Sequence, residues 1–327
     1  MKKSVGMNGF GRFGLHLLKY WLDRRDNSSF SLDYINDDSL DIDKVINIIK
    51  KDKYVKFSKY KIKNLDNSIS ITDAEGLTSI IEFTKLDSEK IDWLGKPDIF
   101  FECTGKNTIK KDSKIFVKNN TKLVIISATS WDPDQTLVYG FNHLDFNKDN
   151  EIISYGSCTV NAYVPFHNYL SKKYKLINAD VNVIHNIQEY KLSSFDTLVR
   201  KFCTLEKSAT LLLEDVNDHN FNVNYTVIPY AGVSMIDFRF QLQKNQNLNE
   251  IKDYLQKGFN DGELSGLYNF VDKDIGPEVH KSTIYSSVFI KDNIKLVGDQ
   301  LYLQAYFDNE NSVNRFYDLS NFISNKI

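Results

Sequence analysis

The sequence predicts an α/β protein of two domains, and three observations lead to this fold class. Strands alternate with helices over the first half of the chain, which is typical of a doubly wound sheet of parallel strands. After about Gly156 the pattern changes to long alternating strands with few crossovers, which is typical of an antiparallel or mixed sheet. The chain also has 327 residues, which is more than a domain with a single hydrophobic core usually contains. We therefore expect a doubly wound domain over residues 1–156, an α+β domain with a mainly antiparallel or mixed sheet over 157–311, and a helix over 312–327 that packs back on the first domain.

The first half begins with a strand, a glycine-rich turn, a helix and a second strand. Ser4 to Met7 is a short strand-like run, and leucines recur at helical spacing from Leu15 to Leu22. Residues 30–35 then alternate apolar and polar and end at a polar tip that contains Asp37. Two further apolar runs complete the predicted parallel sheet, at 99–101, ending in Thr104 and Gly105, and at 123–126, ending in Ser127.

The second half is predicted to consist of long strands with helices between them. An apolar-periodic stretch from Tyr163 to Tyr174 indicates one helix, and Leu248 to Phe259 indicates another. The closing helix has apolar residues spaced for a single face. The strands are expected where apolar and polar residues alternate, at 177–187, 221–230, 233–242, 283–290 and 301–307.

Composition and charge exclude several classes of function. The chain carries 41 Lys and Arg against 43 Asp and Glu, a net charge of −2, so it lacks a basic stripe for nucleic acid. No apolar run approaches the ~18 residues of a bilayer span, and the N-terminal stretch lacks the pattern of a signal peptide. Three cysteines and six histidines without metal-ligand spacing argue against a disulfide framework and a metal site. We expect a reduced, cytoplasmic protein that binds neither nucleic acid nor membrane.

The glycine-rich turn predicts a dinucleotide site. Residues 9–14 fit the pattern G-x-G-x-x-G, in which the first glycine permits a tight turn, the second lets a pyrophosphate approach and the third lets helix and strand pack closely. Asp37 follows Gly14 by 23 residues, where a carboxylate accepts from both ribose hydroxyls and repels a 2′-phosphate. This arrangement favours NAD over NADP. The alternative is a structural glycine turn with a solvated aspartate.

One cysteine and one histidine are candidates for chemistry. Cys158 lies just before the helix expected from Tyr163, and a helix N-terminus stabilises a thiolate and offers N–H donors to an oxyanion. His185 ends a predicted strand at the mouth of the sheet, where it can be the base that a thiol nucleophile needs. Each is also compatible with a structural role, because an isolated cysteine is usually a small buried hydrophobe.

Several separate segments resemble the phosphorylating glyceraldehyde-3-phosphate dehydrogenases, and together they run through most of the chain. They are Val5–Gly14 with the opening signature, Ile35–Asp37 with the adenosine-ribose segment, Glu102–Gly105 with the E-x-T-G turn, Ser157–Pro165 with S-C-T-T-N-C-L-A-P, and Tyr306–Glu310 with W-Y-D-N-E. The resemblance implies a Rossmann-type NAD-binding domain and a catalytic domain, with Cys158 as nucleophile and His185 as general base. The implied cofactor-binding residues are Gly9, Phe10, Gly11, Arg12, Phe13, Asp37, Thr104, Gly105, Ser127 and Asn309.

The mechanism implied by this resemblance proceeds through a thioester. The Cys158 thiolate attacks an aldehyde, His185 takes the hydroxyl proton as hydride passes to NAD, and phosphate or water releases the acid. The resemblance also implies a homotetramer. A homodimer is the alternative, because the loop after His185 is shorter than the family's and lacks its S-T-G-A-A segment.

The phosphate-recognition residues of this family are not retained. Residues 185–190 replace its threonine-rich run, Thr226–Tyr230 lacks the arginine of its R-V-P-T segment, and the second cysteine of its active-site segment falls on Ala162. We therefore predict altered substrate choice, a small polar aldehyde, with Ser157, Thr159 and Arg200 as substrate contacts. Other basic residues could substitute for the arginine or be solvated charges: Lys191, Lys201, Lys207 and Arg239. The alternatives are an ordinary phosphorylating enzyme and a catalytically idle NAD-binding protein with a regulatory or interaction role.

Overall fold

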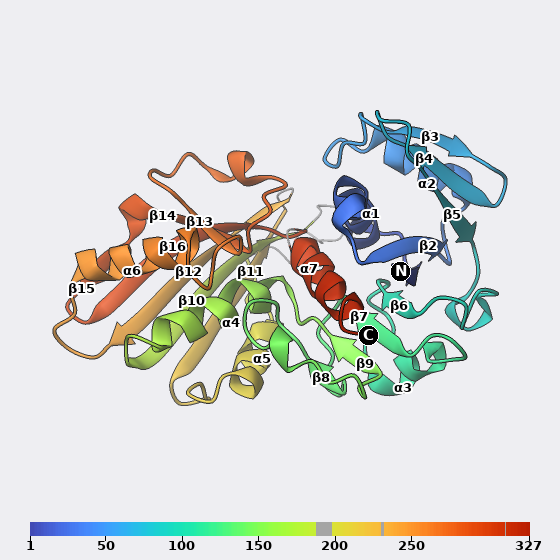
Figure 1. The fold of residues 1–327 in the computed structure, drawn as a ribbon. Coiled ribbons are helices and arrows are strands. Elements are labelled where there is room, and N and C mark those ends of the chain that lie inside the picture. The colour runs from blue at the N-terminus through green and yellow to red at the C-terminus, as the bar shows by residue number, and fades with distance from the viewer. Residues whose placement is uncertain (188–197, 230–231, 311) are drawn as a thin grey trace. The chain divides into compact units, whose positions relative to one another are not determined.

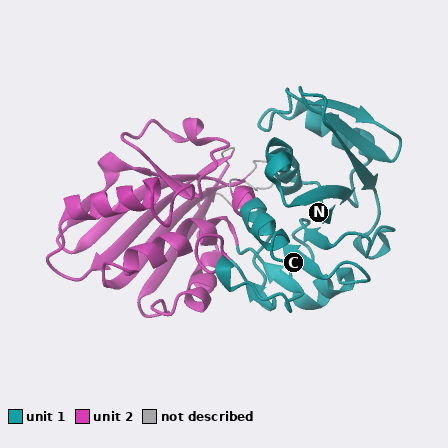
Figure 2. Ribbon diagram, in the orientation of Figure 1, with its two compact units in different colours: residues 1–137, 143–156, 316–327 teal, residues 138–142, 157–315 magenta. Residues whose placement is uncertain are grey.

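The computed structural model describes residues 1–187, 198–229, 232–310 and 312–327. The described chain forms two compact units, which Figure 2 shows in different colours. Unit 1 comprises residues 1–137, 143–156 and 316–327, and unit 2 comprises 138–142 and 157–315. Lys191, Tyr230 and residues 188–190 of the segment after His185 lie outside the described residues.

Unit 1 is built on a mostly parallel sheet, which confirms the first half of the predicted fold class (Figure 1). β1 (Lys3–Asn8) lies between β2 (Phe30–Asn36) and β6 (Ile99–Glu102), and all three run parallel. The parallel order continues through β7 (Leu123–Ile126), β9 (Ile152–Ser154) and β8 (Gln135–Thr136). Beyond β2 lie three strands that the sequence analysis did not predict, β5 (Thr78–Thr84), parallel to β2, followed by the antiparallel β4 (Ser68–Thr72) and β3 (Lys61–Asn64).

Both faces of this parallel sheet are buried, as the unbroken apolar runs of its strands require. On one face, the ring of Phe100 stacks on Phe116 of the short segment after α3 (Lys110–Ser113), with centroids 4.1 Å apart. On the other face, the next residue of β6, Phe101, packs edge-on against Phe30 and Phe316. Successive side chains of a strand point to opposite faces, so two adjacent phenylalanines fill two separate cores.

Two helices of unit 1, and a third that belongs to it from Phe316 onward, form where apolar residues recur at helical spacing. α1 (Arg12–Arg24) buries its leucine side, and α2 (Ile42–Lys51) begins at Asp41, whose side chain accepts a hydrogen bond from the Lys44 N–H. α7 (Ser312–Ser324) closes the chain, and its Phe316 ring contacts Phe13 and Tyr155. Within the described residues, no helix is long and apolar enough to cross a membrane.

Unit 2 is built on a mixed sheet, which confirms the second half of the predicted fold class. β10 (Leu176–Asn186) pairs parallel with β11 (Phe221–Ile228) and antiparallel with β12 (Val233–Leu242). The sheet continues through β16 (Gln300–Asp308), β14 (Ser287–Ile290) and β13 (Tyr268–Val271), and β15 (Lys295–Val297) pairs with β16. The strand expected over 283–290 is therefore shorter at its start than predicted.

Helices α4 (Cys158–Ser171), α5 (Thr204–Leu212) and α6 (Leu248–Asn260) share one apolar core with this sheet (Figure 1). Alternate residues of β12, such as Phe238 and Phe240, point into that core, and Phe166 of α4 packs against both. α4 begins five residues earlier than predicted, at Cys158 rather than Tyr163. It also contains Pro165, which has no N–H to donate to the carbonyl of Asn161, and that carbonyl accepts instead from the Tyr268 hydroxyl at 3.1 Å.

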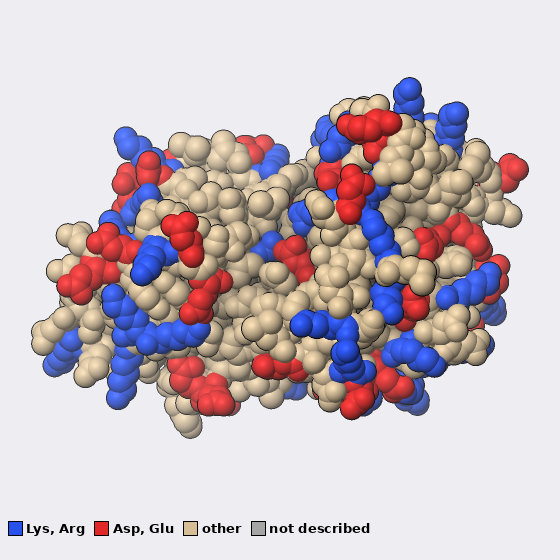
Figure 3. Space-filling model, viewed as in Figure 1, with Lys and Arg blue, Asp and Glu red and all other residues tan. Residues whose placement is uncertain are grey.

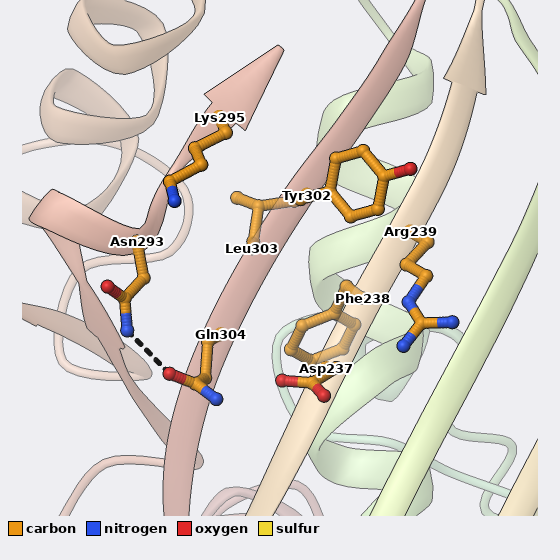
Figure 4. A pocket seen from close by; sticks show the side chains of 8 residues that line it. All are labelled: Asp237, Phe238, Arg239, Asn293, Lys295, Tyr302, Leu303 and Gln304. Carbon is orange, nitrogen blue, oxygen red and sulfur yellow. Dashed lines mark hydrogen bonds between the residues drawn. The ribbon is translucent and has the colours of Figure 1, made fainter. Parts of the chain in front are cut away.

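The opposite face of the unit 2 sheet is polar. Asp237 and Arg239, which alternate with the buried residues of β12, line a pocket there together with Tyr302 and Gln304 of β16 (Figure 4). Arg239 also donates to Asp180 at 3.1 Å. Because this face lies away from the helices, Arg239 is not positioned to serve a site at the N-terminus of α4. On the face that Figure 3 shows, acidic and basic side chains are interspersed over each unit, in keeping with the balanced composition.

Candidate active site

Cys158 is the first residue of helix α4. Gly156 has a φ of 86°, which turns the chain out of β9, and Ser157 is extended and caps the helix by accepting from the Val160 N–H. The cysteine thus stands where the first N–H groups of a helix are unpaired within the helix and where the helix dipole is positive. It is half-buried at the edge of the apolar core of unit 2.

His185 reaches Cys158 because of its register on β10. Val181 and Val183 point toward the helices, and two residues further on His185 points to the same face at the end of the strand. Its Nε2 lies 3.5 Å from Cys158 Sγ, and its Nδ1 lies 2.8 Å from the carbonyl of Asn186. That carbonyl can only accept, so the ring proton sits on Nδ1 and Nε2 is left as an acceptor facing the sulfur. The structure therefore brings together the two residues predicted to carry the chemistry.

Burial keeps this pair neutral at rest. Desolvation raises the pKa of Cys158 to about 12, and the neighbouring Cys203 adds to the rise. Desolvation lowers the pKa of His185 to about 4. Opposing the burial, backbone N–H groups at the start of α4 lower the pKa of Cys158. The proton therefore rests on the sulfur, with a neutral imidazole in place to receive it.

A chain of hydroxyl groups joins the N-termini of α4 and α5 beside Cys158. Thr204 Oγ1 donates to Ser157 Oγ at 3.0 Å, and Ser157 Oγ lies 3.2 Å from Thr159 Oγ1. Thr159 Oγ1 in turn lies 3.6 Å from Cys203 Sγ. Two of the three residues predicted as substrate contacts, Ser157 and Thr159, thus lie together, and they flank Cys158 in the sequence.

The third predicted substrate contact, Arg200, is directed elsewhere. Its Nη2 donates to the carbonyl of Val223 at 3.0 Å and lies 3.5 Å from a carboxylate oxygen of Glu206. Its side chain is 56% exposed. Nothing in these contacts brings the guanidinium to Cys158, and a substrate role for Arg200 stays a prediction.

Asn309 follows β16 and is held by two neighbours from other strands. Its Nδ2 donates to Asn186 Oδ1 at 2.6 Å, and its Oδ1 accepts from Ser234 Oγ at 2.5 Å. Asn186 is buried, and its own Nδ2 has no hydrogen-bond partner among the described residues. A buried amide N–H without a partner costs about 1–3 kcal/mol, so a ligand carbonyl here is favoured. This pair of asparagines therefore fits the carboxamide of a nicotinamide ring.

The residues predicted to bind the cofactor in unit 1 lie at the end of its sheet where the parallel strands have their carboxyl termini. They follow the carboxyl ends of neighbouring parallel strands, which is where open α/β sheets bind ligands. In strand order they are Gly9 after β1, Asp37 after β2, Thr104 and Gly105 after β6, and Ser127 after β7.

The three glycines of the turn differ in what a side chain at each position would contact. A Cβ on Gly14 would lie 2.4 Å from the Gly9 carbonyl oxygen, and Gly9 itself has a φ of +100° with the Thr104 backbone nitrogen 2.8 Å from its Cβ position. A Cβ on Gly11 would meet nothing within 4 Å among the described residues. Gly11 also begins α1 without a side-chain cap. This open cradle at a helix N-terminus fits a pyrophosphate.

Asp37 is hydrogen-bonded to the backbone of the glycine-rich turn. Its Oδ2 accepts from the Phe10 N–H at 2.8 Å, and its Oδ1 accepts from the N–H groups of Ser39 and Leu40 at 3.0 and 2.9 Å. The carboxylate is therefore fixed in place with lone pairs remaining, and a ribose hydroxyl can share them.

The turn after β6 is organised by a buried carboxylate. Glu102 accepts from the backbone and side chain of Thr104 and from the amides of Asn8 and Asn107. Burial raises the pKa of Glu102, although these hydrogen bonds oppose the rise. The Ser127 N–H donates to the Glu102 carbonyl at 2.9 Å, which ties β7 to the same turn.

Two predicted cofactor residues have their side chains engaged within unit 1. The Arg12 guanidinium contacts Asp52 and His16, and the Phe13 ring packs against Tyr155 and Phe316. Any contact of Arg12 with a pyrophosphate would therefore be made by its backbone N–H in the first turn of α1.

Sequence reasoning missed Thr204, Asn186 and Ser234, which support the two catalytic candidates and Asn309. Thr204 was not identified because it is the first residue of α5, and the cap residue before it, Cys203, is of a type that rarely caps helices. The only local signal was Glu206, whose side chain accepts from the Cys203 N–H at 3.2 Å, as in a capping box. Within the described residues, no group of three His, Cys, Asp or Glu could hold a metal ion.

Comparison with known proteins agrees with this geometry. Residues 3–110 match the family described as glyceraldehyde 3-phosphate dehydrogenase, NAD binding domain. Glyceraldehyde-3-phosphate dehydrogenase 1 of Bacillus cereus is 26% identical over 99% of this chain and 99% of its own length. Glyceraldehyde-3-phosphate dehydrogenase 1 of Giardia intestinalis is 27% identical over 100% of this chain and 99% of its own length, and the enzyme of Geobacillus stearothermophilus is 24% identical over 100% and 99%.

Proposed function

We propose that this chain is a divergent member of the glyceraldehyde-3-phosphate dehydrogenase family and that it oxidises a small polar aldehyde with NAD through a covalent adduct of Cys158. The observation that carries the proposal is the 3.5 Å separation between Cys158 Sγ and His185 Nε2. The orientation of the imidazole by the Asn186 carbonyl makes Nε2 the acceptor in that contact. NAD, when bound, supplies the acceptor for the hydride that leaves the substrate carbon.

His185 takes up a proton twice in the proposed reaction. First, Cys158 gives its thiol proton to Nε2 as the sulfur attacks the aldehyde carbon, and the imidazolium returns that proton to the former carbonyl oxygen. Next, Nε2 takes the proton of the same hydroxyl as the carbon gives up its hydride. The product is a thioester on Cys158. Phosphate or water then attacks the thioester carbon, and the departing sulfur leaves a carboxylic derivative.

Hydroxyl groups recognise the polar end of the aldehyde in this proposal. Ser157, Thr159 and Thr204 bring three hydroxyl oxygens together where the N-termini of α4 and α5 meet, and Cys158 is the first residue of α4. Such donors hydrogen-bond a hydroxyl or an oxyanion without requiring a fixed guanidinium. The same group of donors also favours a second candidate, phosphorolysis of the thioester in an ordinary phosphorylating enzyme, because helix N-termini attract phosphate.

The test is NADH formation by the purified protein with glyceraldehyde and with glyceraldehyde 3-phosphate, each with and without inorganic phosphate. Cys158→Ser is the variant, and Cys103→Ser is its matched control because Cys103 lies in unit 1. We expect activity that Cys158→Ser abolishes and Cys103→Ser retains, with NAD binding unchanged in both. Activity on the phosphorylated aldehyde that requires inorganic phosphate would establish the second candidate instead.

Absence of NADH with every aldehyde, with NAD bound and Cys158 resistant to alkylation, would contradict oxidation and favour the idle NAD-binding protein. Assembly as a homotetramer, or as a homodimer, and a cytoplasmic location form part of the proposal. They are supported by the relatives' similarity over nearly their whole length. Sedimentation velocity of the purified chain distinguishes the two assemblies, and fractionation of the source cells tests the location.

A further inference from the structure

The proposed mechanism uses one of the two cysteines at the junction of α4 and α5. Cys158 is the first residue of α4, and Cys203 is the cap residue that precedes α5. The two helix starts are tied together by the hydrogen bond from Thr204 to Ser157. Cys203 Sγ lies 3.6 Å from the hydroxyl of Thr159, the residue next to Cys158. Two sulfurs thus stand at two helix N-termini that meet.

The two sulfurs differ in exposure. Cys203 is 3% exposed, whereas Cys158 is partly open to solvent. A small oxidant therefore reaches Cys158 first, because Cys203 is buried in the core of unit 2. The two are close enough that the charge of a Cys203 thiolate raises the pKa of Cys158, and the Thr159 hydroxyl acts to lower the pKa of Cys203.

We propose that Cys203 is the resolving cysteine of a reversible oxidation at Cys158. In the first step the Cys158 thiolate, its proton taken by His185, attacks one oxygen of hydrogen peroxide. The O–O bond breaks, the leaving hydroxide takes the proton back from His185 and departs as water, and Cys158 becomes a sulfenic acid. In the second step the Cys203 thiolate attacks the Cys158 sulfur, an S–S bond forms, and the S–O bond breaks to release hydroxide, which takes up the Cys203 proton as water. The sulfurs are oxidised by two electrons and the peroxide is reduced to water.

Position at a helix N-terminus suits Cys203 to this role. The unpaired N–H groups and dipole of α5 stabilise its thiolate, although burial by itself raises its pKa. The hydrogen bond from Thr204 to Ser157 and the contact of Cys203 Sγ with the Thr159 hydroxyl keep the start of α5 against the residues on either side of Cys158. The disulfide occupies the nucleophile and protects it from irreversible oxidation to the sulfinic acid.

The experiment exposes the purified full-length protein to hydrogen peroxide and follows the thiols by mass spectrometry, which requires no enzymatic turnover. Intact wild-type protein should lose two hydrogen atoms in mass, and digestion should yield one Cys158–Cys203 linked peptide. Dithiothreitol should restore both thiols. In Cys203→Ser, Cys158 should instead gain oxygen atoms, react with dimedone at the sulfenic stage, and remain partly oxidised after dithiothreitol.

Cys103→Ser is the matched control and should behave as the wild type. Cys203→Ser should fold, because serine is a better helix cap than cysteine, and circular dichroism checks this. A disulfide that contains Cys103, a link between two chains, or equal overoxidation of wild type and Cys203→Ser would overturn the proposal. If the proposed aldehyde oxidation fails but the linked peptide forms, the redox role stands on its own.

Discussion

Substitution of two glycines in the same turn separates cofactor binding from folding. In Gly14→Ala the new Cβ would lie 2.4 Å from the Gly9 carbonyl oxygen, so α1 must move away from the turn. Overpacking of this kind costs about 1–3 kcal/mol. Because about 1 kcal/mol lowers the melting temperature of a domain of this size by about 2–4 °C, we expect Gly14→Ala to melt about 2–12 °C below wild type.

Gly11→Ala should leave stability nearly unchanged and weaken NAD binding. Its Cβ meets nothing within 4 Å in the described structure, and its φ of −74° is accessible to alanine. Loss of a good helix cap lowers the free energy of unfolding by about 1 kcal/mol. Replacement of glycine by alanine also lowers the conformational entropy of the unfolded chain, which raises the free energy of unfolding by about 0.4–1 kcal/mol. The methyl group, however, enters the space that the pyrophosphate is expected to occupy.

The assay compares melting temperatures with and without NAD, together with calorimetric titration of NAD. At a concentration of 100 times the dissociation constant, NAD stabilises the wild type by about 2.7 kcal/mol, and a tenfold loss of affinity reduces this to about 1.4 kcal/mol. We expect at least this tenfold loss in Gly11→Ala. Wild-type NAD affinity in Gly11→Ala would refute the placement of the pyrophosphate at this turn.

Three further predictions concern charge and proton transfer. His185→Ala should lower kcat about 10²–10⁴-fold, measured as NADH formation, with NAD affinity unchanged. Asp37→Asn removes one of the two oxygens that accept from backbone N–H groups, together with the negative charge that repels a 2′-phosphate. It should therefore reduce the ratio of NAD affinity to NADP affinity in titrations, whereas Asp38→Asn, at an adjacent position, should not. Burial lowers the pKa of His16 to about 3, so the unfolded chain binds the proton first and stability falls as pH drops below about 6.5. Between pH 7 and pH 5 this amounts to about 2 kcal/mol, and thermal unfolding of His16→Gln should show a correspondingly flatter pH profile.

The fold class could be predicted because its main strands carry their signal locally. The buried runs of β6 and β7 and the alternation of β12 are readable without knowledge of their partners. β3 was missed because its four residues, Lys61–Asn64, include a single buried side chain and so show no alternation. The start of α4 was placed too late because Ser157 and Cys158 resemble loop residues until the cap on Val160 is known.

The candidate nucleophile and base could be identified separately, but their contact could not. Cys158 and His185 are 27 residues apart, and their meeting depends on the register of β10 beneath the first turn of α4. Register is a property of paired strands, because a slip of one residue would turn His185 to the opposite face. The hydrogen bond from His185 to the Asn186 carbonyl likewise exists only in the folded strand end.

Substrate recognition was the least predictable part of the site, because it depends on what pairs with each charge. Arg200 looked available in the sequence, yet Glu206 and the Val223 carbonyl hold its guanidinium. Arg239 looked equally available, yet Asp180 holds it on the face of the sheet away from α4. The groups that do stand beside Cys158 are small hydroxyls, Ser157 and Thr159, brought together by the start of α5. Recognition by short hydroxyls and helix N–H groups favours a compact polar substrate, because donors on short side chains reach only atoms that lie close to the start of α4.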